Sequence, residues 1–410
     1  MYEEIPLEEA LALLLNHTKP IGFEEIDLIN ALGRVLYENI VANFSLPPFD
    51  RSPLDGYAVI AEDTAVATKE NPILLKVCQK IFAGDLPSKS LVSGEAAAVA
   101  TGAPLPPGTN AVIKIEHTQL VKEKVVIFAP LQPGDNFINK GDDVLEGEKI
   151  LLKGMTVTPA VIGLLASLGR RTVKVFKKPQ VAVLTIGDEL VGIDEPRLPG
   201  KIYNSNVYAI SAQITEAGGR AVPYKSAVDD MDHIAYLLNC CLKENDMVIT
   251  TGGVSVGTRD YVKEAIKISG SNTLFWKVNI KPGTPIVCAE NKGRLIIGLS
   301  GNPAAAMITF YMLIRPVLQS ISGMRHVTLP DVTAIMAESF NKKSKQRRML
   351  RAKVFWKNGC YHAIPCGTQS PGALKSMLRC NALIDIPAGR GPVNIGEEMK
   401  AILLSPAYVS

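Results

Sequence analysis

The sequence predicts a multidomain protein of the α/β plus β class, with a doubly wound α/β domain between β-rich parts. Its 410 residues exceed the roughly 250–300 beyond which a single hydrophobic core usually divides. From Gln180 onward, β-rich runs alternate with amphipathic helical runs, which is typical of a parallel sheet covered by helices. Residues 56–150 and 324–410 instead contain short β-rich runs separated by Gly and Pro, which is typical of barrel-like modules and small β domains.

The first part of the chain is predicted to be helical and then extended. Residues 5–15 have the spacing of a short amphipathic helix, and residues 23–33 predict a second helix that ends at Gly33. Three prolines in residues 45–55 predict a rigid, extended segment that crosses to the next module. The predicted elements that follow are strands at 74–77, 97–100, 111–115 and 124–128 and a helix at 159–168.

The α/β domain is predicted from alternating elements. Apolar, β-branched runs predict buried strands, and amphipathic runs between them predict the covering helices. The predicted strands are 181–185, 220–226, 247–250, 273–278 and 295–299, and the predicted helices are 206–217, 231–243, 260–268 and 303–321.

Composition, charge and cysteine spacing argue against several classes of protein. A net charge of +4 with scattered basic residues does not indicate a nucleic-acid partner. The longest apolar stretch, residues 159–168, is shorter than the roughly 20 residues of a membrane span, and residues 1–4 lack the basic start of a secretory signal. Seven cysteines without C-x-x-C spacing favour reduced thiols, so we expect a cytoplasmic protein. Five dispersed histidines argue against zinc but leave open a hard cation such as Mg²⁺.

A glycine-rich loop follows the predicted strand 247–250. Residues 251–260 read T-G-G-V-S-V-G-T-R-D and lead into a predicted helix. Gly252 and Gly253 carry no side chains, so backbone N–H groups of the loop could face an anion. The carboxyl end of a parallel strand is also where ligands bind in such sheets. The loop therefore predicts a ligand site that includes Ser255 and Asp260.

A second loop of the same kind joins the last strand to the last helix. Residues 298–306 read G-L-S-G-N-P-A-A-A. Asn302 suits the N-cap position and Pro303 suits the first helical turn, while Gly301 leaves room for a ligand. Two such loops on one sheet favour a phosphate-bearing ligand.

Acidic residues follow three predicted strands. Asp188 and Glu189 follow the first, Asp229 and Asp230 the second, and Asp260 the third. The carboxyl ends of parallel strands share one edge, so these carboxylates are expected to converge, where they could bind a cation. The alternative is that they are helix N-caps, and for Asp230 the two interpretations are equally supported.

Two groups of basic residues have two interpretations each. Lys277 and Lys281 are four residues apart, so in an extended segment both would point to one face and could bind an oxyanion. They could equally be solvated lysines of an edge strand. The run 342–348, K-K-S-K-Q-R-R, is expected to be a solvated surface, with capture of an anionic ligand as the alternative.

Taken together and in order, the motifs resemble the molybdopterin molybdenumtransferases, known as MoeA in bacteria and as the E domain of gephyrin in animals. The resemblance covers essentially the whole chain. Its motifs are S-P-L-D-G-Y-A (52–58), T-G-A-P-L-P (101–106), N-K-G-D-D-V (139–144), G-D-E-L (187–190), N-S-N (204–206), the glycine-rich loop (251–260), K-P-G (281–283) and G-N-P (301–303).

This resemblance implies a specific architecture. Residues 1–45 and 145–178 would form an extended helical and β domain, and residues 46–144 an inserted β-barrel-like domain. Residues 179–325 would form a three-layer, MogA-like α/β domain that binds molybdopterin, and residues 326–410 a C-terminal β domain. Similar family members are elongated homodimers whose active cleft lies between the α/β domain of one subunit and the inserted domain of the other.

The resemblance also implies a reaction and its residues. The family inserts molybdate into adenylylated molybdopterin and releases AMP, assisted by Mg²⁺. The adenylyltransferase and apo-molybdoenzymes are the other expected partners. Glu189, Asp229 and Asp260 would bind the metal. The residues that match catalytic positions are Asp55, Thr101, Asp143, Glu189, Asp229 and Asp260. Those that match substrate-binding positions are Gly252, Gly253, Ser255, Lys277, Lys281, Gly301, Asn302, Pro303, Arg351 and Ser370.

Three departures from the family pattern keep alternatives open. Leu54 replaces a methionine, Ser300 replaces a proline, and Thr284 replaces a lysine. Loss of a lysine near an oxyanion site could change the preferred metal to tungsten. A pterin-binding paralogue that inserts no metal, or a scaffold protein, is a second alternative. An adenylyltransferase fits less well, since those proteins carry T-G-G-T-G in this loop and lack the other domains.

Overall fold

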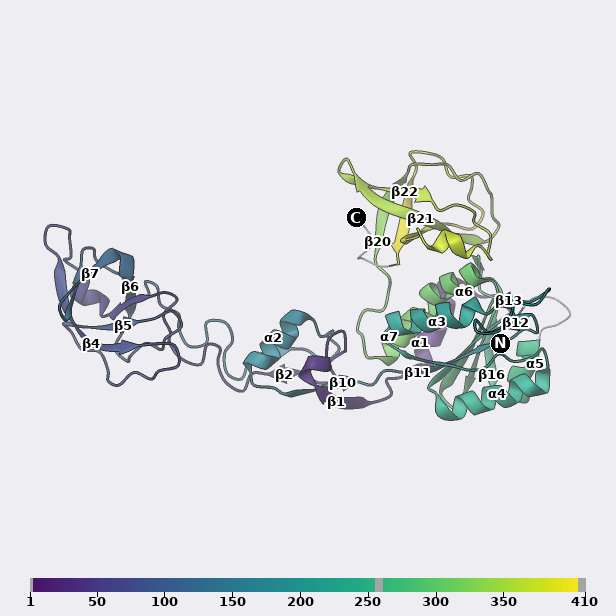
Figure 1. The fold of residues 1–410 in the computed structure, drawn as a ribbon. Helices are drawn as coiled ribbons and strands as arrows, with labels where there is room; N and C mark the ends of the chain where they lie inside the picture. Colours follow the sequence, from purple (N-terminus) through teal and green to yellow (C-terminus); the bar gives the residue numbers. More distant parts are fainter. Residues whose placement is uncertain (1–2, 255–260, 405–410) are drawn as a thin grey trace.

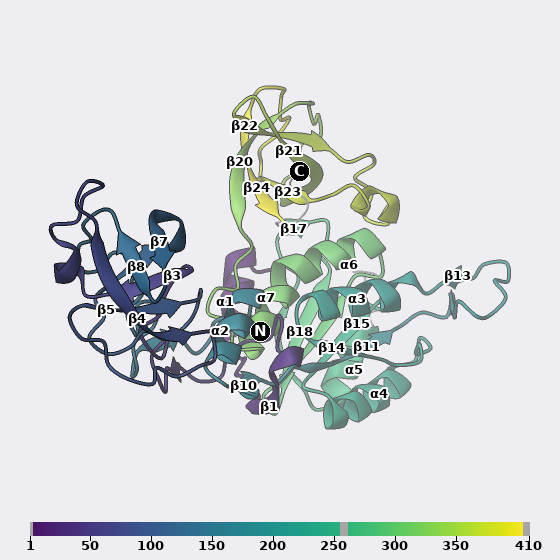
Figure 2. The same cartoon turned by 60° about the vertical axis from the view of Figure 1, so that its left-hand side comes forward.

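The computed structural model describes residues 3–254 and 261–404. Ser255 and Asp260 lie outside these described residues. Figure 1 shows the inserted β domain at one end of the molecule and the α/β domain at the other, with a small extended domain between them. The C-terminal β domain lies beside the α/β domain in both views (Figures 1 and 2). The arrangement agrees with the expected multidomain α/β plus β class.

The α/β domain contains a six-stranded sheet whose order is β14-β11-β15-β19-β18-β16. Four strands are parallel, and β18 is antiparallel to both of its neighbours, so β16 again runs in the direction of β19. All carboxyl ends except that of β18 therefore meet at one edge. The bounds are β11 Gln180–Thr185, β14 Arg220–Pro223, β15 Met247–Thr251, β16 Asn272–Trp276, β18 Ile286–Asn291 and β19 Arg294–Leu299.

Helices cover both faces of this sheet because its central strands are apolar on both sides. Val181 and Val183 face one cluster, whereas Ala182 and Leu184 face the other. One face carries α3 (Ser205–Glu216), α6 (Pro303–Thr309) and α7 (Arg315–Ile321), and the other carries α4 (Met231–Glu244) and α5 (Tyr261–Ile268). The three layers are visible in Figure 2.

The helix that begins at Pro303 continues to Ile321 through a π-helical turn, Phe310–Ile314. It is the one helix of the described residues long and apolar enough to cross a membrane, but 67% of its most apolar window is buried. Its apolar composition is explained by its place in the core. At the other face, Asp230 caps α4 by accepting a hydrogen bond from the His233 N–H at 2.7 Å, so the N-cap interpretation of Asp230 is confirmed.

The N-terminal segment differs from the prediction. Helix α1 (Leu7–Asn16) is present, but the helix expected at 23–33 is wrong. Residues Phe23–Asp27 form β1, followed by a 3₁₀ turn at Leu28–Asn30. Exposed and half-buried positions alternate along β1, as in a strand. β1 pairs with β10 (Thr172–Phe176), a partner about 150 positions away that no local pattern shows.

The extended domain is completed by β2 (Ile40–Val41), β9 (Lys149–Leu151) and α2 (Pro159–Ser167). Its core joins residues from both chain segments, including Leu36, Ile40, Leu151 and Val173. Helix α1 packs elsewhere: Leu7, Ala10 and Leu14 belong to the core of the α/β domain. The first helix is therefore part of the α/β domain in space, although the chain around it leads into the extended domain.

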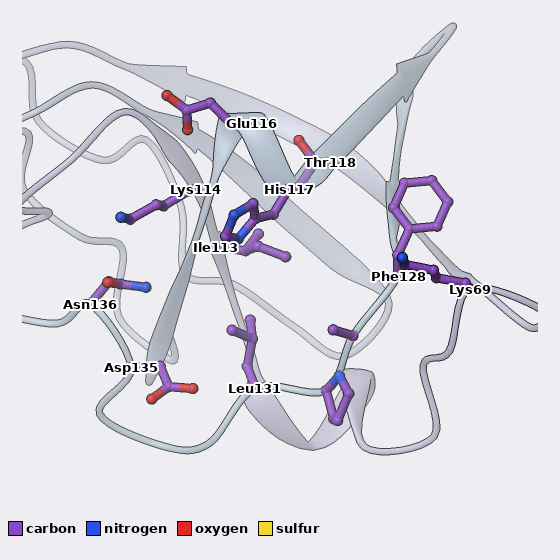
Figure 3. Close-up of a pocket in the computed structure, with 12 residues that line it drawn as sticks. Lys69, Ile113, Lys114, Glu116, His117, Thr118, Phe128, Leu131, Asp135 and Asn136 are labelled. Atoms are coloured by element: carbon purple, nitrogen blue, oxygen red, sulfur yellow. The ribbon is translucent and has the colours of Figure 1, made fainter.

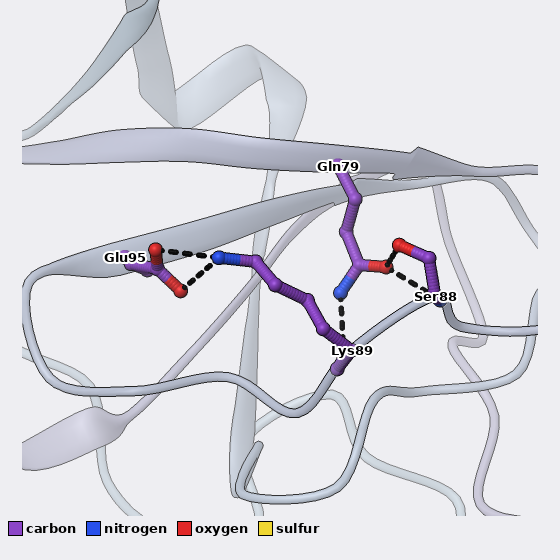
Figure 4. Close-up of polar contacts among 4 residues, drawn as sticks. All are labelled: Gln79, Ser88, Lys89 and Glu95. Carbon is purple, nitrogen blue, oxygen red and sulfur yellow. Dashed lines mark hydrogen bonds and ion pairs between the residues drawn. The ribbon is translucent and has the colours of Figure 1, made fainter.

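The inserted domain is a six-stranded sheet of order β6-β3-β5-β4-β8-β7. The strands are β3 Gly56–Val59, β4 Ile73–Ile81, β5 Glu95–Val99, β6 Ala111–Lys114, β7 Thr118–Val121 and β8 Lys124–Ile127. The strand β3 begins at Gly56, inside the motif 52–58. A polar cluster ties the loop before β5 to the sheet (Figure 4). In it, Lys89 pairs with Glu95 at 2.7 Å, and Gln79 bonds to Ser88 and Lys89.

The C-terminal domain contains a sheet of order β17-β21-β22-β20-β24-β23. Its first strand, β17 (Ile280–Lys281), comes from the α/β part of the chain and pairs with β21 (Arg347–Lys357). The basic run 342–348 is only partly a solvated surface: Arg347 forms an ion pair with Asp385 at 2.6 Å, and Arg348 is buried. The other strands are β20 Asp331–Met336, β22 Cys360–Pro365, β23 Ala382–Ile386 and β24 Glu398–Leu403.

Candidate active site

A cavity of about 470 Å³ lies at the carboxyl ends of β11, β15 and β19. It brings together both glycine-rich loops and two of the predicted acidic residues. The predicted residues that line it are Glu189, Asp229, Gly252, Gly253, Gly301, Asn302 and Pro303. Their convergence matches the expectation that parallel strands present their loops at one edge.

Close backbone packing shapes the first glycine loop. Gly252 has φ +91°, and a Cβ atom there would lie 2.1 Å from the Ile186 carbonyl oxygen. Its N–H donates to the Leu299 carbonyl at 3.1 Å. Only glycine therefore fits at this position, and the loop lies flat between the ends of β11 and β19.

The acidic side of the cavity is formed by Glu189 and Asp229. Gly187 has φ +151°, and the Glu189 carboxylate occupies the space that a Cβ atom at Gly187 would need. The Asp229 N–H donates to the Asp188 carboxylate at 3.2 Å, which joins the two acidic segments. Within residues 3–254 and 261–404 no group of three His, Cys, Asp or Glu side chains is arranged to hold a metal ion. The third predicted metal ligand, Asp260, and the predicted substrate residue Ser255 lie outside those ranges.

The second loop is held by the C-terminal domain. Asn302 occupies the N-cap position of α6 and Pro303 lies in the first turn, as predicted, although the Asn302 side chain makes no capping hydrogen bond. Instead the Ala305 N–H donates to the Pro371 carbonyl at 3.1 Å. The Gly301 carbonyl accepts from the Asn206 side chain at 2.9 Å.

Lys277 and Lys281 do not share one extended segment. Lys277 has φ +76°, and the Lys281–Pro282 peptide is cis. The spacing argument fails because the chain turns between them: the Lys277 ammonium lies over the Trp276 ring, 4.3 Å from its centre, whereas Lys281 belongs to the C-terminal sheet. Neither residue lines the cavity.

Arg351 is fully buried in the C-terminal domain, and it does not line the cavity. Its guanidinium donates to Gln369 at 3.3 Å and to the carbonyls of Thr368 and Ser370 at 3.2 and 3.0 Å, and burial lowers the pKa of Arg351. The loop that it holds includes Pro371, which contacts α6. Arg351 thus positions this loop, while Ser370 lies exposed on it.

The other predicted catalytic residues lie in the inserted domain. The Thr101 N–H and hydroxyl donate to the Asp55 carboxylate at 2.6 and 2.8 Å, and these bonds, the backbone one first, hold the pKa of Asp55 below its ordinary value. Asp143 is anchored by its own N–H, which donates to the Leu46 carbonyl at 3.0 Å. Within one chain these residues are far from the cavity, because the extended domain separates the two domains (Figure 1).

Thr101→Val is expected to raise the pKa of Asp55 part of the way to its ordinary value, since the hydroxyl bond is lost and the backbone bond remains. A lowered carboxyl pKa stabilises this contact above the ordinary pKa, and the contribution is lost as pH falls through the lowered pKa. Carboxyl carbon NMR titration measures the change. Thr118→Val, which removes a hydroxyl bonded only to the Ile115 carbonyl, is the control. An unchanged Asp55 pKa would contradict the assignment.

The inserted domain also contains a larger cavity of about 870 Å³ (Figure 3). Apolar side chains such as Phe128 and Leu131 line it together with Lys114, His117 and Asp135. None of the predicted site residues lines this cavity, and its size alone assigns no chemistry to it.

Sequence reasoning missed several residues of the active-site cavity. They are Ile186, Gly187, Ile202, Val254, Tyr261 and Pro285. Tyr261 follows the glycine-rich loop directly, and Gly187 precedes Glu189, so both could have been predicted from their positions in the sequence. Ile202 and Pro285 gave none, because their place depends on how the loops fold back over the sheet.

Comparisons with known proteins agree along the whole chain. Family models match residues 5–169 (MoeA N-terminal region, domains I and II), 182–320 (probable molybdopterin binding domain) and 333–404 (MoeA C-terminal region, domain IV). A molybdopterin molybdenumtransferase of Bacillus subtilis is 36% identical over 98% of this chain and 94% of its own. One of Staphylococcus aureus is 33% identical over 97% and 95%. A crystal structure of a molybdopterin biosynthesis MoeA protein from Pyrococcus horikoshii has a TM-score of 0.87 at 32% identity, covering 98% of this chain and all of that chain.

Proposed function

The chain belongs to the MoeA family of molybdopterin molybdenumtransferases, which are transferases of molybdenum cofactor biosynthesis, and from this premise we propose the reaction that it performs. It inserts molybdate into adenylylated molybdopterin: the phosphoanhydride bond is cleaved, AMP leaves, and molybdenum remains on the dithiolene. The observation that carries this proposal is one cavity that combines two glycine-rich loops with Glu189 and Asp229.

Different residues of the chain have different proposed roles in this reaction. The two loops supply backbone groups and small side chains against which a phosphate-bearing ligand can lie. Lys277 and Lys281 lie outside the lining of the cavity, and their proposed part is to neutralise charge from its surroundings as AMP leaves. Such chemistry depends on positioning and electrostatics more than on a nucleophile, which fits a cavity without an activated Ser or Cys among its described lining residues.

Glu189 and Asp229 fit a magnesium ion, with Asp260 as the third proposed ligand. Mg²⁺ is usually bound through one or two carboxylates together with substrate phosphates and water, so two carboxylates on one side of the cavity are sufficient. When bound, the ion would polarise the phosphoryl oxygen. The protein's own part is to hold the two carboxylates facing the glycine-rich loops.

The complete site is proposed to need two copies of the chain. Asp55, Thr101 and Asp143 cannot reach the cavity of their own chain, because the extended domain lies between (Figure 1). In a homodimer the inserted domain of one copy would supply them to the cavity of the other. This explains why catalytic residues are divided between two distant domains.

The oxyanion preference rests on two altered positions. The Thr284 hydroxyl donates to the Ile280 carbonyl at 2.6 Å, so it serves its own turn where a lysine would add charge. Ser300 lines the cavity, and its hydroxyl accepts from the Asn302 N–H at 3.3 Å. Tungstate insertion is therefore the second candidate. Cytoplasmic location and hand-over between an adenylyltransferase and apo-molybdoenzymes complete the proposal.

The decisive test is release of AMP from adenylylated molybdopterin with Mg²⁺, titrated with molybdate and tungstate in parallel. We expect AMP release that depends on an oxyanion, and the oxyanion that half-saturates at lower concentration identifies the metal. Asp230→Asn, which alters only the cap of α4, is the matched control for Asp229→Asn. Binding of the nucleotide without AMP release with either oxyanion would favour a paralogue that inserts no metal.

A further inference from the structure

A second cation lies beside Lys277 at the sheet edge that carries the active-site cavity. The Lys263 ammonium is 3.5 Å from the centre of the Trp276 ring, and the Lys277 ammonium is 4.3 Å from the same centre. Because both distances are measured to the same ring centre, their sum is the largest possible separation of the two ammonium nitrogens. Two ammonium groups on one indole ring are like charges, and an anion bound by both would remove their mutual repulsion.

No carboxylate of the described residues supplies that negative charge. Neither Lys263 nor Lys277 takes part in an ion pair among residues 3–254 and 261–404. Contact with the indole face favours an ammonium group but leaves N–H donors directed away from the ring. The indole Nε1–H of Trp276 is itself buried without a hydrogen-bond partner in the described structure. The two ammonium groups therefore retain donors that an anion can satisfy, and the unpartnered indole N–H belongs to the same group of residues.

The topology places this group of residues, the Lys263–Trp276–Lys277 cluster, at the edge where ligands bind. Trp276 ends β16, which runs in the direction of β19, so its carboxyl end lies on the same edge as both glycine-rich loops. Lys263 is in the first turn of α5, which packs beside β16 (Figure 1). Along this edge the acidic residues Glu189 and Asp229 follow β11 and β14, at the opposite side of the sheet from β16.

We infer that Lys263 is a further substrate-binding residue, held in place by Trp276, and that with Lys277 it binds a phosphate group of the substrate. This rests on the proposed function, which supplies a substrate with a phosphoanhydride. The carboxylates make one end of this sheet edge negatively charged, and the lysines make the other end positively charged. The substrate is thereby oriented, with its cation-bridged oxygens toward Glu189 and a phosphate oxygen toward Lys263 and Lys277.

The test uses inorganic pyrophosphate with Mg²⁺ as the probe and Trp276 as the reporter. The chain has two tryptophans, and the other, Trp356, is exposed in the C-terminal domain, so Trp356→Phe leaves Trp276 as the single emitter. We expect pyrophosphate to change the Trp276 emission as the lysines leave the ring. Lys263→Met should raise the dissociation constant at least about tenfold, and Lys263→Arg should restore it to within about threefold.

Lys267→Met is the matched control, since Lys267 lies on the same helix but pairs with Glu264 at 2.8 Å. It should change the dissociation constant less than about twofold. If Lys263→Met behaves like Lys267→Met, or if pyrophosphate leaves the emission of the parent protein unchanged, the inference is wrong. AMP release by the parent protein, measured separately, tests the proposed function. If the parent protein releases AMP but pyrophosphate binding does not depend on Lys263, only the inference about Lys263 is wrong. If pyrophosphate binding depends on Lys263 but no AMP is released, the inference is supported and the proposed reaction is wrong.

Discussion

Mixing two inactive variants, Asp55→Ala and Glu189→Ala, is expected to restore about a quarter of the parental rate of AMP release. In a two-fold symmetric dimer each site would combine the inserted domain of one copy with the α/β cavity of the other. A mixed dimer then carries both substitutions in one site and none in the second. After random exchange half of the dimers are mixed, and each has one intact site.

Two controls define this result. Mixing Glu189→Ala with Asp229→Ala should restore nothing, because both residues line the same cavity of one chain. Mixing Asp55→Ala with Thr101→Ala should also restore nothing, because the two residues are hydrogen-bonded to each other in one inserted domain. Recovery in these controls, or no recovery in the first mixture after verified subunit exchange, would contradict a site shared between copies.

Gly252→Ala is expected to have the largest effect of any single methyl group added to the chain's active-site loops. The new Cβ atom would lie 2.1 Å from the Ile186 carbonyl oxygen at φ +91°, so the loop must move away from β11. We expect the free energy of unfolding to fall by about 3–5 kcal/mol. AMP release should fall at least about 100-fold in the molecules that remain folded, because a loop that lines the cavity is displaced.

Gly270→Ala separates the steric clash from the backbone conformation. Gly270 also has a positive φ, +75°, but a Cβ atom there meets nothing within 4 Å. This control should cost only about 1–2 kcal/mol, the ordinary penalty of the left-handed region, and should leave turnover unchanged. Chemical denaturation and the AMP assay measure both. Equal losses for the two variants would show that contact with Ile186 does not shape the site.

The alternation of apolar strands with amphipathic helices allowed the α/β domain to be predicted from the sequence. Buried strands such as Val181–Thr185 were visible because a parallel strand covered on both faces is a continuous apolar run. Because parallel strands present their carboxyl ends at one edge, strand order along the chain was enough to group Glu189, Asp229 and both glycine-rich loops. From the sequence, Asp230 could be either a cation ligand or a helix N-cap. The hydrogen bond that it accepts from the His233 N–H shows that it is an N-cap.

The failures share a physical cause, namely dependence on distant chain segments. β1 is a strand because β10 pairs with it, and β3 is a strand because β5 and β6 lie on either side. The relative placement of Lys277 and Lys281 could not be derived from their spacing, because Lys277 has a positive φ and the chain turns before β17. Arg351 does not line the cavity and donates to the carbonyls of Thr368 and Ser370, so its match to a substrate-binding position stays a prediction.

The strand β17 has a consequence for how the molecule holds together. Residues 280–281 leave the α/β part of the chain and pair in parallel with β21, opposite Arg347 and Arg348. The C-terminal sheet therefore begins with a strand that is encoded more than forty residues before its own domain. Met349, Leu383 and Ile402 also enter the core of the α/β domain. Severing the peptide connection after Gly323 would therefore not set the C-terminal sheet free. We therefore expect the two domains to unfold together, since a rotation of one against the other would break the pairing of β17 with β21.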